Sequence, residues 1–448
     1  MKVLYNKIPN NIFGKYCSSP QRKQYPNLMP LQKDIVSFSS KVKAPEKSPI
    51  IINDLNDRVL DSIQPVTKNH DCYVVGGYMR DYFNGRKKSH DWDLVCTDSS
   101  KALADEIAEL RGGTVVPLDD RYGIYRVVLN DKVTEFDIAQ AQQNDIEVDC
   151  HRRDLTINSI FYNLNTHEVY DPFNGVTDIE NKVLRTASLD NMKADPLRIL
   201  RVYRFIAKTG FKVDEGLAQC CKENVGLLDK ISRERIYSEI MNILSAPYLK
   251  DSLNKMQDDG LLRTLFPSLP ENDNTIRNAI NQTEKIPREK PLLKLMALLS
   301  TSKKPLDEIE TDLKNLKFTK KQVSFITKML ENRITQKKLN QDDTKRAFAE
   351  IIKSLGDDTE DGIILAKAQF DDDKLEELHQ HFTEIKSTLP DYKPLLNGTE
   401  IVNTLGIKPS KRIGIISNEL LMQQLMGNVK TTEDAVEFIR NNLLNLNQ

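Results

Sequence analysis

Residues 74–93, VVGGYMRDYFNGRKKSHDWD, constrain the fold most, because they read as a strand, a glycine turn, a helix and a second strand in quick succession. Side chains alternate between the two faces of a strand, so Asp91 and Asp93 lie on one face of the second strand. Two carboxylates on one face provide the hard oxygen ligands that suit Mg²⁺. The stretch therefore predicts an α/β unit with a metal site on a strand.

The residues around this carboxylate pair indicate nucleotidyl transfer with two metal ions. Gly76 and Gly77 lack a Cβ, so backbone N–H groups can approach a triphosphate closely. Arg80 lies about one turn into the helix, where a guanidinium can bind phosphate in a bidentate way. Two ions about 3.5–4 Å apart would activate an attacking hydroxyl and stabilise a leaving pyrophosphate. An Asp-x-Asp pair alone is more often a solvated strand end, so this prediction depends on motifs further along the chain.

The next segment predicts the rest of a small mixed sheet. Thr97-Asp98-Ser99 caps a helix, and strand-like stretches follow at 114–118, 122–129 and 133–139. The last stretch contains Asp137, which we expect to be a third carboxylate facing the same metal ions. Glu135 has the same strand parity and is the alternative.

Residues 151–159, HRRDLTINS, concentrate polar side chains in one short segment. Arg152, Arg153, Asp154 and Asn158 are suitable partners for the phosphates and the ribose of a nucleotide. The alternative is an ordinary polar helix start, with Asp154 as its cap.

Residues 194–206, ADPLRILRVYRFI, predict a helix with Asp195 as its cap. Arg198, Arg201 and Arg204 recur every three residues and form a cationic stripe beside the apolar face. Such arginines are costly next to a core unless they meet phosphates, a base or acids. An ion-paired helix face is the alternative to a nucleotide site.

Composition limits the remaining possibilities. The chain has 448 residues, enough for two to four domains, and a formal net charge of −1, so any nucleic-acid surface must be a local patch. It has no apolar run of about 18 residues, so we expect no membrane-spanning helix. Its six cysteines are scattered without Cys-x-x-Cys spacing, which is typical of a reduced, cytoplasmic protein.

Taken together, these segments resemble the class II nucleotidyltransferases, and more narrowly the bacterial CCA-adding tRNA nucleotidyltransferases and the poly(A) polymerases. The resemblance rests on GGYMRD with Asp91-x-Asp93, RRDLTINS, DPLRILRVYRF and ERIYSEI, in the family's order and spacing through about residues 70–245. Residues 397–427 are also similar to the family's C-terminal helical segment. Each motif alone is weak, but four in order are specific.

The resemblance implies a polymerase-beta-like α/β nucleotidyltransferase head with a small mixed sheet, followed by an all-α neck, body and tail. The expected divisions are a disordered basic leader at 1–48, the head at 49–185, a nucleotide-selecting neck at 186–245, a helical body at 246–390 and a tRNA-binding tail at 391–448. In the tail, the basic loop with Lys408, Lys411 and Arg412 would grip the tRNA; by itself it reads as a connection between two helices.

The resemblance also assigns roles at the site. Asp91 and Asp93 would bind Mg²⁺, while Gly77, Arg80 and Arg153 would hold the phosphates and sugar, with Asp154 near the ribose. The substrates would be CTP, ATP and the 3′ end of tRNA.

Asp195 and Arg198 would act as a protein template for the incoming base, with Arg201 and Arg204 supporting them. A carboxylate accepts a hydrogen bond from the amino group of C or A, and a guanidinium donates to the neighbouring ring acceptor. Guanine and uracil present a carbonyl in place of that amino group and would be rejected.

One departure from the family bears on the product. Full CCA-adding members carry a longer flexible loop before the RRD motif, linked to the switch from CTP to ATP, whereas only QAQQNDIEVDCH (140–151) stands here. A CC-adding enzyme that leaves the final A to a separate A-adding partner is therefore an alternative. A poly(A) polymerase acting on general RNA is a second, and a non-catalytic RNA-binding protein, opposed by the intact Asp91/Asp93 pair, is a third.

Overall fold

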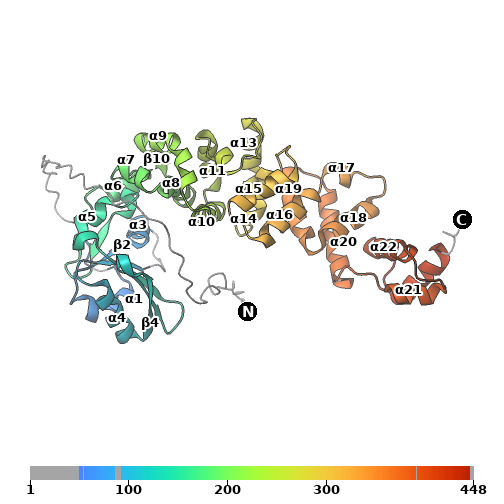
Figure 1. Ribbon diagram of the computed structural model, residues 1–448, viewed down its shortest axis with the longest axis horizontal. Coiled ribbons are helices and arrows are strands. Elements are labelled where there is room, and N and C mark those ends of the chain that lie inside the picture. Colours follow the sequence, from blue (N-terminus) through green and yellow to red (C-terminus); the bar gives the residue numbers. More distant parts are fainter. Residues whose placement is uncertain (1–49, 54, 86–91, 390, 444–448) are drawn as a thin grey trace, which may run out of the picture. The chain divides into compact units, whose positions relative to one another are not determined.

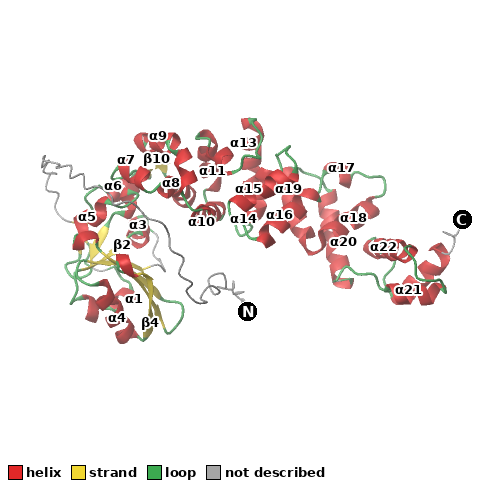
Figure 2. Cartoon of the chain, viewed as in Figure 1, coloured by secondary structure: helices red, strands yellow, loops and turns green. Residues whose placement is uncertain are grey.

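The computed structural model describes residues 50–53, 55–85, 92–389 and 391–443. The predicted leader at 1–48 and Asp91 lie outside these residues. Strands occur in the N-terminal half, and every regular element described after Val213 is a helix (Figures 1 and 2). A mixed sheet followed by helices is the architecture that the sequence predicted.

The sheet has eight strands in the order β1-β8-β7-β2-β3-β6-β5-β4. The strands are β1 (Ile50–Ile51), β2 (Cys72–Val75), β3 (Trp92–Cys96), β4 (Gly113–Asp119), β5 (Ile124–Leu129), β6 (Glu135–Gln140), β7 (Phe161–Asn163) and β8 (Glu168–Tyr170). Among the described strands of this sheet, β3 and β6 pair in parallel and all other neighbours are antiparallel. The three strands predicted between residues 114 and 139 are confirmed, while β1, β7 and β8 extend the sheet beyond the predicted part.

The central strands bury both of their faces. Val74 and Leu94 belong to the main apolar core, whereas Val75 and Val95 pack on the other side with Phe161. Helices of this part of the chain are α1 (Arg58–Asp61), α2 (Gln64–Thr67), α3 (Gly77–Phe83), α4 (Ser100–Arg111), α5 (Ile146–His151) and α6 (Gly175–Glu180). Packing on both faces fixes the positions of these strands and of the residues at their ends. The residues of the predicted site lie at these ends.

Four helices follow the sheet and include the arginine-rich segment. They are α7 (Leu189–Ala194), α8 (Leu197–Thr209), α9 (Glu215–Glu223) and α10 (Arg233–Leu244), with a short parallel pair between β9 (Val183–Leu184) and β10 (Lys212–Val213). Helix α8 packs against α10 and the following helix, α11 (Leu249–Asp258). It buries Leu200 and Tyr203, and this leaves its arginines along the edge of the core.

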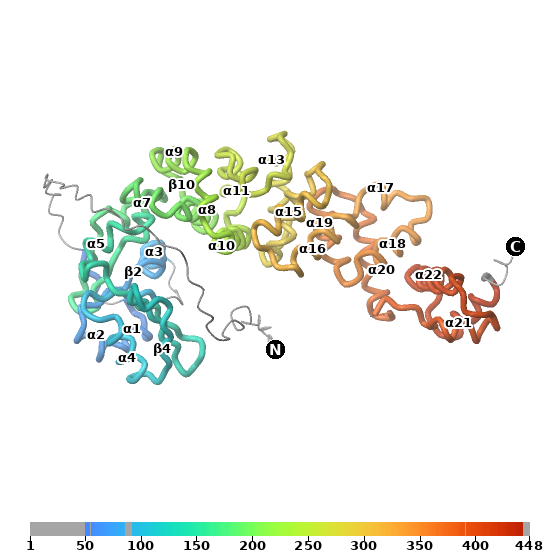
Figure 3. Tube along the Cα trace, viewed as in Figure 1, coloured from blue at the N-terminus to red at the C-terminus, as the bar shows by residue number. Residues whose placement is uncertain are grey.

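The rest of the described chain is a succession of helices. They are α12 (Leu261–Leu265), α13 (Asp273–Gln282), α14 (Pro291–Leu299), α15 (Leu306–Asn315), α16 (Lys320–Glu331), α17 (Gln336–Leu339), α18 (Thr344–Leu355), α19 (Thr359–Gln369), α20 (Lys374–Thr388), α21 (Gly398–Leu405), α22 (Arg412–Leu425) and α23 (Thr432–Phe438). Helices α21 and α22 lie side by side (Figure 3) and share a small core of their own around Ile401 and Leu420. No helix in the described ranges is both long and apolar enough to cross a bilayer.

Gly175 fixes the turn that precedes α6. Both carboxylate oxygens of Asp171 accept hydrogen bonds from this turn, from the backbone N–H of Gly175 at 2.7 Å and of Val176 at 3.0 Å. A Cβ on Gly175 would stand 2.3 Å from the carbonyl oxygen of Thr156. The turn therefore packs directly against the segment that carries Asp154 and Asn158.

We expect Gly175→Ala to destabilise the protein by about 1–3 kcal/mol, because the methyl group has no space beside a backbone carbonyl. The comparison is the thermal unfolding midpoint against Gly414→Ala in α22, where an added Cβ meets nothing within 4 Å. Alanine is the better helix former, so this control should be neutral or stabilising. Equal midpoints for the two variants would contradict the packing argument.

Candidate active site

Strand register brings the predicted carboxylates together. Strands β3 and β6 run in parallel with Asp93 opposite Asp137, and β2 places Val75 on the other side of Asp93. The glycine turn after Val75 therefore starts beside both carboxylates. Asp91, the first acid of the pair, lies just before the described residues resume at Trp92.

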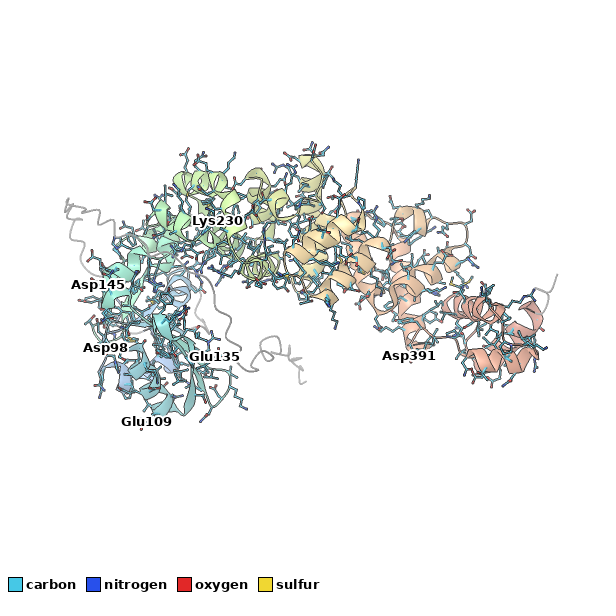
Figure 4. The ribbon with its side chains drawn as sticks, viewed as in Figure 1. Asp98, Glu109, Glu135, Asp145, Lys230 and Asp391 are labelled. Carbon is cyan, nitrogen blue, oxygen red and sulfur yellow. The ribbon has the colours of Figure 1, made fainter. Side chains whose placement is uncertain are left out.

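Asp137 is held by an arginine from the neighbouring strand. Arg126 on β5 contacts both of its oxygens, with Nε–Oδ1 at 2.6 Å and Nη2–Oδ2 at 2.7 Å. Its Nη1 also lies 3.0 Å from Oε2 of Glu135, which is labelled in Figure 4. Only Asp137 of these two acids stands opposite Asp93 and lines the cavity described below. This position favours Asp137 as the third carboxylate, and Arg126 is a partner that the sequence did not reveal.

Gly76 must be glycine for two reasons. Its φ of 70° and ψ of −128° lie in a region that L residues with a side chain avoid. A Cβ at this position would also stand 3.1 Å from Oδ2 of Asp93. The turn therefore passes close to the carboxylate, at a position where a side chain would be strained and crowded.

Arg80 is buried next to this turn, at 3% exposure. Its Nη1 donates to Oδ1 of Asn158 at 2.9 Å and its Nε to Asp81 at 3.0 Å. Its Nη2 has no hydrogen-bond partner in the described part of the chain and lies 3.5 Å from where a Cβ on Gly77 would be. A buried donor of this kind is costly unless an acceptor satisfies it, and a phosphate oxygen fits the requirement.

The two arginines of the RRD motif share one buried acid. Asp149 on α5 is fully buried, and it pairs with Arg152 (Nε–Oδ1, 2.7 Å) and Arg153 (Nη2–Oδ2, 3.0 Å). The guanidinium of Arg153 also lies over the ring of Phe161, 4.7 Å from its centre. The sequence analysis missed Asp149, although an acid followed by cations at three and four residues is a helical pairing pattern.

Asp154 is buried and joins the sheet part of the site to α8. Its Oδ2 lies 2.8 Å from Nη2 of Arg201, and its Oδ1 accepts from Asn158 Nδ2 and from the backbone N–H of Leu155. Burial is the largest influence and acts to raise the pKa of Asp154. The charge of Arg201 and the hydrogen bonds outweigh it and hold that pKa below its ordinary value.

Arg204 has a similar partner from α10. Its Nε lies 3.1 Å from Oε2 of Glu239, and its guanidinium lies 4.9 Å from the ring centre of Phe205. Burial raises the pKa of Glu239 and lowers the pKa of Arg204. Arg201 and Arg204 thus meet acids, as the ion-pair alternative has it, and both also face the cavity.

The proposed template pair stands where α7 ends and α8 begins. Helix α8 starts at Leu197 with Pro196 as its N-cap residue, so Asp195 precedes the cap by one residue, although its Oδ1 accepts from the N–H of Leu197 at 3.3 Å. Its Oδ2 lies 3.0 Å from Nη2 of Arg235. Arg198 donates to the carbonyl of Asn191 at 3.0 Å, and burial lowers its pKa.

One cavity of about 850 Å³ collects these side chains. The predicted residues that line it are Gly76, Gly77, Arg80, Asp93, Asp137, Arg153, Asp154, Asn158, Asp195, Arg198, Arg201 and Arg204. Arg152 of the RRD motif also lines it, as do Lys208, Asn242 and Arg288, which were not predicted. The described lining contains eight cations and four acids, so the cavity suits an anionic ligand.

The remaining predicted residues lie elsewhere. Lys408 and Lys411 are exposed in the connection between α21 and α22, Arg412 is exposed as the first residue of α22, and none of the three lines this cavity. As for a metal, the described residues include no group of three or more His, Cys, Asp or Glu side chains that would hold an ion. Asp93 and Asp137 supply two adjacent carboxylates, and the donors are oxygen atoms alone, which fits Mg²⁺.

Two parts of the sequence match the models of known protein domains. Residues 72–185 match the poly A polymerase head domain, and residues 210–272 match a domain described as "Probable RNA and SrmB-binding site of polymerase A". Both matched domains are domains of the tRNA nucleotidyltransferase and poly(A) polymerase family. These matches confirm the resemblance that the ordered motifs indicated.

Several tRNA nucleotidyltransferases are similar to this chain over about half of its length or more. A CC-adding tRNA nucleotidyltransferase of Synechocystis sp. is 26% identical over 387 residues, covering 82% of this chain and 92% of that protein. One of Geobacter sulfurreducens is 31% identical over 218 residues, covering 49% and 50%. A CCA-adding enzyme of Staphylococcus aureus is 27% identical over 289 residues, covering 61% and 67%.

The fold is that of solved members of the family. The structure of a CCA-adding enzyme with ATP has a TM-score of 0.73 to this chain at 22% identity, covering 89% of this chain and 100% of that one. An α/β head followed by helices is therefore the shared architecture.

We expect Arg201→Met to destabilise the protein at pH 7, because it leaves the carboxylate of Asp154 buried without its counter-charge. Since Arg201 is 36% exposed, the loss should be about 1–3 kcal/mol, less than for a fully buried pair. In the wild type, the stabilisation is present above the ordinary pKa of Asp and is lost as pH falls through the depressed folded value. In the variant, burial still raises the pKa of Asp154 but the charge of Arg201 no longer lowers it, so Asp154 takes up a proton at higher pH.

The difference in thermal unfolding midpoint between the wild type and Arg201→Met should therefore be largest near pH 7 and should become smaller as the pH falls. Thermal midpoints measured from pH 7 to pH 4 test this, with Lys101→Met, which removes an exposed ion pair to Asp105, as the control. A gap that stays constant or widens as pH falls would speak against the pairing.

Proposed function

We propose that this protein adds CMP, and in the complete reaction also AMP, to the 3′ end of tRNA, without a nucleic-acid template and with release of pyrophosphate. The supporting observation is that one cavity is lined by the carboxylates Asp93 and Asp137, by several arginines and by the Asp195 and Arg198 pair. The family includes CCA-adding and CC-adding enzymes, which agrees with this activity.

Asp91 and Asp93 would hold two Mg²⁺ ions, with Asp137 beside them. When bound, such ions activate the attacking hydroxyl and neutralise charge on the leaving pyrophosphate. The chain's own contribution is position: Arg80 offers its unsatisfied Nη2 to a phosphate, and the turn at Gly76 lets the backbone approach the triphosphate. The terminal ribose 3′-hydroxyl of the tRNA would attack the α-phosphate.

Asp195 and Arg198 would select the base. Arg235 and the N–H of Leu197 hold the carboxylate of Asp195 in place, and the carbonyl of Asn191 holds Arg198. A fixed acceptor beside a fixed donor matches the amino group and ring nitrogen of C or A and rejects the carbonyl of U or G. Neither side chain depends on RNA for its position.

The segment before the RRD motif favours addition of CC alone as the second candidate. Residues 140–151 are occupied by the end of β6, the short helix η2 (Gln142–Asn144) and α5. Asp145, labelled in Figure 4, caps α5 through the N–H of Glu147, and Asp149 anchors its far end. Secondary structure therefore takes up most of this short segment. A separate A-adding enzyme would then complete the end.

Incorporation assays on three tRNAs, ending before CCA, after C and after CC, with CTP and ATP supplied separately, test the proposal. We expect the wild type to add both C residues, and addition of A to the third substrate decides between the two candidates. Asp91→Ala should abolish incorporation, while Asp105→Ala, which changes an exposed carboxylate on α4, should not.

Equal inactivity of the wild type and Asp91→Ala would overturn the enzymatic proposal. Long A tails on unrelated RNA would instead identify a poly(A) polymerase.

Asp195→Ala should lower kcat/KM for CTP by about 10–100-fold, the value of one hydrogen bond to a charged group. Incorporation of UTP relative to CTP should rise, because the group that distinguishes the amino group from the carbonyl is gone. The control is Asp190→Ala, an exposed acid on α7. Unchanged selectivity between CTP and UTP would rule out Asp195 as part of the template.

A further inference from the structure

A second cavity of about 520 Å³ adjoins the first and is built entirely from residues 246–294. Its walls are the segment between α10 and α11, the turn between η5 (Thr283–Lys285) and α14, and the first turn of α14. Ala246, Pro247 and Arg288 line both cavities. The two cavities therefore share one stretch of wall.

Lys294 is the unusual residue of this second cavity. It lies in the apolar helix α14 and is 5% exposed. No residue of the described ranges gives it an ion pair or a hydrogen bond. Buried lysines are ordinarily paired, because an isolated ammonium is costly to remove from water.

The charges around Lys294 increase this cost. Burial lowers its pKa most, and the nearby guanidinium of Arg288 lowers it further, against a smaller opposite effect of Glu289. Arg288 is itself fixed, since its Nε donates to the carbonyl of Ser245 at 2.7 Å. Of the other basic residues that line the cavity, Lys250 pairs with Glu284 at 2.7 Å and Lys285 is exposed. Lys294 and Arg288 are thus two neighbouring cations, and no residue of the described ranges forms an ion pair with either of them.

We propose that Lys294 and Arg288 bind a backbone phosphate of the RNA substrate's 3′ strand, upstream of the nucleotide whose hydroxyl reacts. This inference rests on the proposed function. An RNA strand whose 3′ end lies beside Asp93 in the first cavity carries a phosphodiester at every nucleotide. The phosphates before the reacting nucleotide must therefore lie along a neighbouring part of the protein surface. Arg288 is the cation common to both cavities, and Lys294 continues the path beyond it.

Pyrophosphate is also an anion that Lys294 and Arg288 could bind, but the position of these two residues suits it less well than an RNA phosphate. The residues expected to hold the triphosphate, such as Gly77 and Arg80, belong to α3, and the second cavity contains no residue from the sheet or from α3. An anion released from those residues does not need Lys294. The two sources are separated by the measurements below.

The test uses the full-length protein with Lys294→Met, which keeps the unbranched apolar stem and removes the charge. We expect its Kd for tRNA lacking CCA to rise about three- to tenfold and the slope of log Kd against log salt to fall by about one. The KM for CTP should stay within about twofold, since a lost phosphate contact with RNA leaves the nucleotide site intact. Lys294→Arg should retain the affinity.

Lys314→Met is the matched control. This lysine lies on α15, is exposed and pairs with Glu310, so the variant loses the same charge outside both cavities. Its tRNA affinity should equal that of the wild type. Affinity that falls equally in both lysine variants would mean a general charge effect and would overturn the site.

RNA with one uncharged backbone linkage can locate the contact with the wild-type protein alone, even if a variant fails to fold. Minihelix RNAs with a single methylphosphonate, scanned along the 3′ strand, should bind the wild type more weakly at one position. That same RNA should bind Lys294→Met no more weakly than the unmodified minihelix does, because the contact is already lost. A scan without any such position contradicts the proposal.

The remaining outcomes separate the inference from the function. If Lys294→Met weakens product inhibition by pyrophosphate while its tRNA Kd is unchanged, the cavity binds pyrophosphate and the RNA proposal is wrong. If the wild type is active on tRNA and Lys294→Met binds tRNA with the same Kd and salt slope, only this inference fails. If the wild type incorporates no nucleotide into tRNA, the proposed function itself fails.

Discussion

The parallel pairing of β3 with β6 is the constraint on which the site depends. It sets Asp93 opposite Asp137 although 43 residues of chain separate them, and a shift of the register by one residue would turn one carboxylate to the other face. The glycine turn then has its place next to both acids, because β2 pairs with the other edge of β3. Apolar packing on both faces of these strands holds that register.

The site also contains several buried charged side chains, and most of them form ion pairs with other side chains of the protein. Asp149 serves Arg152 and Arg153, Asp154 meets Arg201, and Glu239 meets Arg204. These contacts orient the guanidinium groups before any ligand arrives, which lowers the cost of ordering them on binding. The unsatisfied Nη2 of Arg80 is a donor that this balance leaves over for a ligand.

The sequence predicted those parts of the fold that carry a local signal. The strands between residues 114 and 139 alternate clearly or end at recognisable turns, and Ser99 caps α4 as expected through the N–H of Ala102. Strands β7 and β8 have three residues each, too few for a period to show, and they form because β2 offers a free edge to pair with. The division of the helical part into neck, body and tail stays a prediction.

The amino-acid sequence by itself determined the chemistry of this protein: the spacing of the acids, the glycines of the turn and the arginines of α8 are local patterns, and their order along the chain identified the family. Only the tertiary structure decided which charges meet. Arg126 reaches Asp137, Arg201 reaches Asp154 and Arg288 reaches the cavity from separate elements, and no local period marks such contacts between distant segments. The same holds for Lys294, because burial without a partner is a property of the packed chain and not of any stretch of it.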